Sequence, residues 1–123
     1  MNEQELKYEL AKKYFNNKDY EKAAVLAENL RWLDPLNADY LLLTGNINYA
    51  LQKNDWAVGA YSRALMFDPF NCDAHLGLAL TYIQKGNPKH AVQSLKFVVT
   101  QSAQPELKER AKTLLELLHE PVN

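Results

Sequence analysis

The sequence predicts an all-α solenoid of three helix-turn-helix repeats, followed by a C-terminal capping helix. Small residues recur every 34 positions in two series, Ala11, Gly45, Ala79 and Ala23, Ala57, Ala91. A helix-ending segment recurs at the same interval, because Leu33-Asp34-Pro35-Leu36-Asn37 returns as Phe67-Asp68-Pro69-Phe70-Asn71. A fixed period of this length indicates one supersecondary unit used several times, each burying its apolar face on the next.

Apolar periodicity and turn residues predict seven helices, at about 3–17, 20–33, 38–53, 56–67, 72–85, 88–102 and 105–119. The residue before a proline is pushed out of the helical region, so the two Asp-Pro pairs end the second and fourth helices. The turns inside the pairs are predicted at Lys18-Asp19, Asn54-Asp55 and Gly86-Asn87. Alternating strand patterns and hairpin-type turn sequences are missing from the chain.

The second repeat departs from the other two. Thr44 and Asn48 stand where the repeat pattern expects a leucine and a tyrosine. Trp56 comes two residues later than the 34-residue period predicts from Tyr20, although Ala57 keeps the period. We therefore expect the internal turn of this repeat to be displaced to Asn54-Asp55, and its first helix to be lengthened or rotated.

The chain is expected to be a single domain over 1–123, with repeats at about 4–37, 38–71 and 72–103 and a capping helix at about 105–119. The last helix breaks the period, because no Asp-Pro pair occurs near Ala103. Its apolar residues Leu107, Ala111, Leu114 and Leu118 are spaced three to four apart. They are expected to pack on the preceding helix, around Val92, Leu95 and Val99.

Composition excludes several classes of function. The formal net charge is −1, so the chain lacks the basic footprint of a nucleic-acid-binding protein. The N-terminal residues have no basic region followed by an apolar run, and the apolar stretches are far shorter than a membrane span. With one cysteine and no internal disulfide to form, we expect a cytoplasmic protein without membrane insertion.

No catalytic, metal or cofactor site is predicted. Cys72 and His75 lie three apart, but two ligands do not make a zinc site and the chain has no other cysteine. His90 and His119 have no nucleophile and carboxylate arranged with them in the sequence. We therefore expect a protein that is not an enzyme.

The repeated residues resemble the tetratricopeptide repeat (TPR) over about 4–103. In the first copy these are Leu10-Ala11, Tyr14, Asp19-Tyr20, Ala23 and Asp34-Pro35. The second copy has Leu41, Gly45, Ala57, Tyr61, Ala64-Leu65 and Asp68-Pro69. The third has Leu78-Ala79, Tyr82, Gly86-Asn87 and Ala91.

This resemblance implies that the first helix of each pair lines a concave side. The matching positions are Tyr8, Leu42 and Leu76, then Lys12, Asn46 and Leu80, then Phe15, Tyr49 and Ile83. Seven of these nine are apolar or aromatic, which predicts a groove for the apolar anchors of a protein or peptide partner. The alternatives are that several of them belong to the core, or that the N-terminal segment or a second copy covers them.

A carboxylate clamp of the kind found in chaperone adaptors is not predicted, because its positions hold Tyr8, Lys12, Leu43, Asp73 and Gly77. The architecture is similar to the cytosolic TPR chaperones of bacterial type III secretion. That resemblance implies a chaperone that holds a secreted or export-apparatus protein. A general TPR scaffold within a larger complex is the alternative, and self-association as a homodimer stays open.

Overall fold

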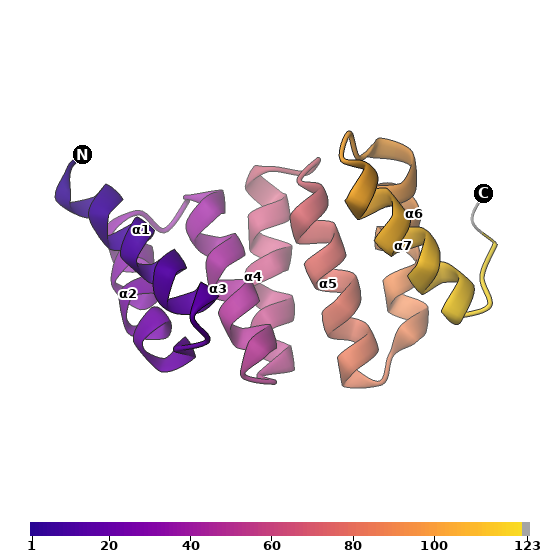
Figure 1. The fold of residues 1–123 in the computed structure, drawn as a ribbon, viewed down its shortest axis with the longest axis horizontal. Helices are drawn as coiled ribbons and strands as arrows, with labels where there is room; N and C mark the ends of the chain where they lie inside the picture. Colours follow the sequence, from indigo (N-terminus) through magenta and orange to yellow (C-terminus); the bar gives the residue numbers. More distant parts are fainter. Residues whose placement is uncertain (122–123) are drawn as a thin grey trace.

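The computed structural model of the chain describes residues 1–121. Within that part the chain forms seven helices and no strand: α1 (Glu3–Asn16), α2 (Tyr20–Leu33), α3 (Ala38–Ala50), α4 (Asn54–Phe67), α5 (Cys72–Lys85), α6 (Pro88–Gln101) and α7 (Pro105–Leu117). The helices follow one another along the long axis, with α1, α3, α5 and α7 in front of α2, α4 and α6 (Figure 1). The predicted all-α solenoid is confirmed.

The prediction that the internal turn of the second repeat is displaced is wrong. α2, α4 and α6 begin 34 residues apart, so the second repeat keeps the period of the others. α3 ends at Ala50 rather than near Lys53, and Asn54 and Asp55 form the start of α4. The turn itself lies at Gln52 and Lys53.

The three turns share one backbone conformation. Lys18, Gln52 and Gly86 have positive φ angles of 64°, 59° and 90°. The N–H of the next residue then donates to the carbonyl five residues before it, as from Lys53 to Asn48 at 2.8 Å. Such a bond satisfies a carbonyl at the end of the preceding helix. Glycine occupies this position only in the third turn. The second turn was misplaced because Trp56 was matched to Tyr20, two residues away from the periodic position.

The recurring Asp-Pro-x-Asn segment ends one helix pair and starts the next. The side-chain oxygen of Asn37 accepts a hydrogen bond from the backbone N–H of Tyr40 at 3.1 Å. Asn71 does the same for Ala74 at 3.0 Å. Each asparagine therefore caps the first turn of the following helix, satisfying a backbone donor that has no partner within the helix.

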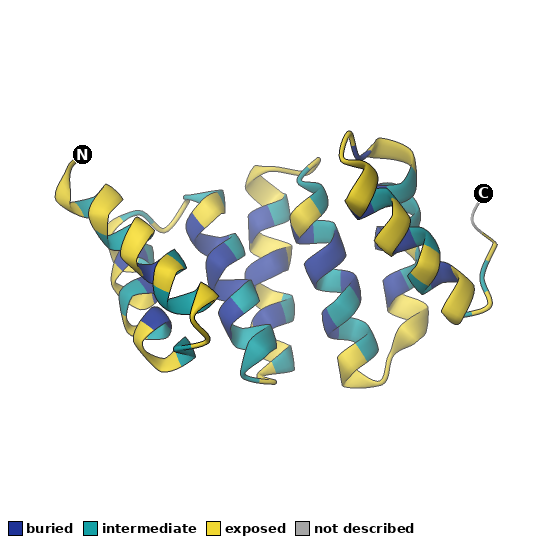
Figure 2. Cartoon of the chain, viewed as in Figure 1, coloured by how far each residue is buried: buried dark blue, intermediate teal, exposed yellow. Residues whose placement is uncertain are grey.

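The core lies between the two layers of helices. Ala11, Ala23, Ala57, Ala79 and Ala91, the alanines of the two small-residue series, have no exposed surface. Figure 2 shows the buried residues concentrated on the middle helices α3 to α5, whereas α1 has one buried residue, Ala11. Contacts between neighbouring helices are close at these positions because a methyl group or a hydrogen replaces a larger side chain.

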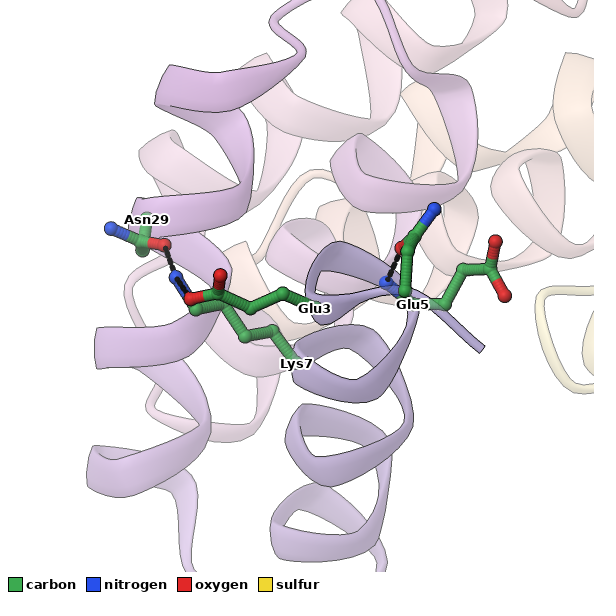
Figure 3. Close-up of polar contacts among 5 residues, drawn as sticks. Glu3, Glu5, Lys7 and Asn29 are labelled. Carbon is green, nitrogen blue, oxygen red and sulfur yellow. Dashed lines mark hydrogen bonds and ion pairs between the residues drawn. The ribbon is translucent and has the colours of Figure 1, made fainter.

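Exposed polar contacts supplement the apolar packing of α1. The Lys7 ammonium donates to the Asn29 side chain on α2 at 2.9 Å and lies 3.4 Å from the Glu3 carboxylate (Figure 3). Asn2 caps α1 by accepting a hydrogen bond from the Glu5 N–H at 2.8 Å. Solvent-exposed pairs of this kind contribute little to stability, about 0–1 kcal/mol each.

α7 packs on α6, as predicted. Leu107, Ala111 and Leu115 are buried against Leu95 and Val98, and Val92, Val99, Leu114 and Leu118 are partly buried around them. Leu115 belongs to this contact although the sequence analysis did not include it. The last helix therefore covers an apolar surface that the third repeat would otherwise expose.

Candidate protein-binding groove

A groove opens on the face formed by α1, α3, α5 and α7. It encloses a cavity of about 570 Å³. Six of the nine residues predicted to bind a partner line it: Phe15, Leu42, Asn46, Tyr49, Leu76 and Leu80. Leu76 contributes little free surface, since it is only 3% exposed. The groove is therefore centred on the second and third repeats.

The other three predicted residues do not line the groove. The Tyr8 ring packs on Tyr40 with their centroids 5.2 Å apart, and burial raises the pKa of the Tyr8 hydroxyl. The Lys12 ammonium lies 4.4 Å from the Tyr8 ring centre and 2.8 Å from Glu9. Its hydrogen bond with Glu9 raises the pKa of Lys12. Ile83 packs against the core shared by α5, α6 and α7.

α7 supplies groove residues that the sequence analysis missed. Leu107 and Arg110 line the cavity together with the groove residues of α5. A signal for this role exists in the sequence, because α7 begins at Pro105, close to one period after the start of α5 at Cys72. α7 thus occupies the place of a fourth first helix as well as covering α6.

Tyr61 of α4 lies behind the groove and forms part of its floor. Its ring lies between α3 and α5, at two glycines: a methyl group placed on Gly45 would lie 2.7 Å from the ring, and one on Gly77 would lie 2.5 Å from it. The ring is 1% exposed, and its hydroxyl donates a hydrogen bond to the side-chain oxygen of Asn46 in the groove. Burial raises the pKa of this hydroxyl well above its usual value, so Tyr61 remains a neutral donor.

Polar groups border the apolar floor. Asp73 on α5 and Arg110 on α7 are exposed and line the cavity. Gln84 reaches back from α5 to the second repeat, donating to the Tyr49 carbonyl at 3.2 Å and to Asn54 at 2.6 Å. An apolar floor with a few polar groups is typical of sites that bind apolar side chains and orient them.

The residues considered as metal ligands are placed apart from the groove lining. His75 pairs through Nε2 with the Pro69 carbonyl at 2.9 Å, and its ring packs 4.1 Å from the Phe97 ring centre. Burial raises the pKa of the neighbouring Cys72 thiol. Across residues 1–121, no three His, Cys, Asp or Glu side chains come together as metal ligands would. In the same residues, no helix combines the length and apolarity needed to cross a membrane.

Comparison with known proteins agrees with this fold. A family model described as TPR repeat matches residues 45–86, and no curated protein matches the chain by sequence. The helix pairs, their period and the groove define an all-α TPR solenoid.

Among solved structures, the chain is similar to SycD, a type III secretion translocator chaperone of Yersinia enterocolitica. In one SycD structure, described as an alternative dimer, the two chains are 25% identical with a TM-score of 0.87. In another, SycD is in complex with a peptide of the translocator YopD, with 27% identity and a TM-score of 0.86. Both matches cover 94% of this chain and 91% of SycD.

The TPR domain of Sgt2 from Aspergillus fumigatus shares the fold at lower identity. It is 18% identical with a TM-score of 0.85, and the match covers 97% of this chain and 81% of the domain. This likeness concerns the fold alone.

Proposed function

We propose that the chain is a non-enzymatic type III secretion chaperone, which holds a segment of a secreted protein in its groove in the cytosol. The observation that carries the proposal is the apolar groove across α1, α3, α5 and α7, in a chain that resembles SycD over nearly its whole length. The SycD structure with a YopD peptide supports this function over that of a general scaffold.

The groove suits a segment with at least two apolar anchors. Leu42 and Tyr49 on α3 and Leu80 on α5 are partly exposed, so they offer apolar surface to a ligand. Asn46 has donors that are not used by its bond to Tyr61, in which its oxygen is the acceptor. We assign these donors to the backbone carbonyls of an extended segment, because such bonds hold a chain without requiring a particular side chain.

Photo-crosslinking tests this proposal in the cell that produces the protein. A photoreactive amino acid replaces Leu80 in the groove or, as the matched control, Val25, which is 71% exposed on α2. We expect the Leu80 derivative to crosslink to a secreted protein and the Val25 derivative not to. Crosslinks from Val25 alone, or from Leu80 only to cytosolic machinery, contradict the chaperone function.

Charge in the groove gives a second test. Leu80→Glu places a carboxylate on the apolar floor, where a partner's apolar anchor would bury it unpaired. The variant is expected to lose the partner, while Val25→Glu is expected to retain it. Circular dichroism establishes that both variants are folded before binding is compared.

A further inference from the structure

The opposite face of the solenoid carries a second hollow, which we call the rear hollow. It consists of two adjoining cavities of about 350 Å³ and about 330 Å³ between α2 and α4. Both cavities are lined by Arg31 of α2, Thr44 and Asn48 of α3, and Trp56 of α4. α3 lies in front of this gap in Figure 1, so it forms the floor.

The rear hollow exists because the second repeat departs from its own pattern. Thr44 and Asn48 stand 34 residues from Leu10 and Tyr14, and the third repeat again has leucine and tyrosine at these positions. The smaller side chains leave unfilled the volume that a leucine and a tyrosine would occupy. Thr44 satisfies its hydroxyl within α3, by donating to the Tyr40 carbonyl at 2.9 Å. Asn48 has no side-chain hydrogen bond among the described residues.

Small residues form part of the walls of the rear hollow. Ala24 and Ala27 of α2 line one cavity, and Gly59 and Ala60 of α4 line the other. A methyl group added to Gly59 would meet no atom within 4 Å, so the packing of this chain does not require glycine there. A glycine in the middle of a helix costs about 0.5–1 kcal/mol relative to alanine. This glycine leaves room for the close approach of another backbone.

The charges around the rear hollow are unbalanced. Its two carboxylates are already paired, Glu28 with Arg31 at 3.0 Å and Asp55 with Lys85. Lys53 lines one cavity and Arg63 the other, and neither forms an ion pair within residues 1–121. Two cations without an ion pair among the described residues therefore line the same cavities as Trp56, which is 74% exposed.

We infer that the rear hollow binds an acidic peptide segment of a second protein, with a large apolar side chain between Trp56 and the alanines of α2. The carboxylates of that segment pair with Lys53 and Arg63, and its backbone passes over Gly59 within reach of the Asn48 amide. An acidic segment fits because the free charges of the hollow are positive. This second site is separate from the groove of the proposed function.

Tryptophan fluorescence measures this binding directly. The chain has two tryptophans, so Trp32→Phe leaves Trp56 as the reporter. The probe is a random copolymer of glutamate and tyrosine, with a lysine–tyrosine copolymer as its charge-reversed control. We expect the acidic copolymer to change the Trp56 emission at low salt, with the effect weakening as salt is added. Equal binding of the two copolymers, or no binding of the acidic one, overturns the inference.

Two sets of variants in this background locate the site. Lys53→Glu with Arg63→Glu is expected to weaken binding of the acidic copolymer at least about tenfold. Lys89→Glu with Lys96→Glu makes the same charge change on α6 and is expected to have a much smaller effect. Equal losses in the two double variants contradict the site, because they indicate general attraction between charges.

Filling the hollow without changing its charge is the decisive test. Thr44→Leu with Asn48→Tyr gives the second repeat the residues of the other two and is expected to abolish the Trp56 response. Gly59→Leu fills the hollow from α4, where an added Cβ meets no atom within 4 Å, so this variant is used if the first one misfolds. Leu80→Glu in the groove is expected to leave copolymer binding unchanged. Unimpaired binding by folded, filled variants, or loss with Leu80→Glu, overturns the assignment to the rear hollow.

Discussion

Substitution by alanine is expected to have opposite effects on stability at Gly77 and Gly59, two glycines in the middle of helices. Gly77→Ala places a methyl group 2.5 Å from Cζ of Tyr61 and 2.6 Å from Cε1, well inside van der Waals contact. Gly59→Ala places one in open space. Alanine favours the helix over glycine by about 0.5–1 kcal/mol in both cases.

Whether Gly77→Ala raises or lowers the free energy of unfolding depends on whether the Tyr61 ring can move away. It cannot move far toward α3, because a methyl group on Gly45 would be 2.7 Å from the same ring, so the backbone there is already close. Overpacking a filled core typically costs about 1–3 kcal/mol. After the helix preference is subtracted, we expect Gly77→Ala to lower the free energy of unfolding by up to about 2 kcal/mol. Gly59→Ala is expected to raise it by about 0.5–1 kcal/mol.

Urea unfolding followed by helical circular dichroism measures both effects, provided that the slope m is unchanged. A cycle with Tyr61→Leu isolates the contact, since Gly77→Ala should cost far less once the ring is absent. The reasoning fails if Gly77→Ala stabilises the chain as much as Gly59→Ala does. It also fails if the cost of Gly77→Ala is the same in the Tyr61→Leu background.

Other perturbations have equally defined outcomes. Ala57→Leu should cost about 1–3 kcal/mol in unfolding free energy, because Ala57 has no exposed surface; an unchanged midpoint contradicts close packing there. Ending the chain at Gln104 uncovers Leu95 and Val98, so sedimentation should reveal stronger concentration-dependent assembly than in the full chain. Tyr61 has a raised pKa in the folded chain, so its contribution to stability is present below the unfolded value of about 10 and lost as pH rises above it. Tyr61→Phe should lose less stability than the natural chain as the pH rises above that value.

The period of the sequence predicted most of the fold because it reports packing directly. Alanine at a position such as Ala23 or Ala91 is required wherever two helices cross closely, so its recurrence marks the repeat. Helix ends were predictable where proline or glycine enforces them. The end of α3 was misplaced because Trp56 was matched to Tyr20, and the left-handed Gln52 gives no signal of the turn in the sequence.

The groove was only partly predictable, because its shape depends on how the repeats are stacked. The repeat pattern identified the groove residues of α3, but it gave the first repeat equal weight, and Tyr8 and Lys12 lie outside the cavity. It also omitted Arg110, since the break in period suggested only a cap for α7. The place of Tyr61 at two glycines could not be read from the sequence either, because Gly77 lies outside both small-residue series.

α3 contributes side chains to two opposite faces of the solenoid. Successive residues turn by about 100° around a helix, so Leu42, Asn46 and Tyr49 share one face while Thr44 and Asn48 lie nearly opposite. The structure agrees, since the first three line the groove and the last two line the rear hollow. α3 has neighbours on both sides, so its apolar residues are spread around the helix and not confined to one face. Because the two sets of side chains do not overlap, substitutions in one site are expected to leave the lining of the other intact.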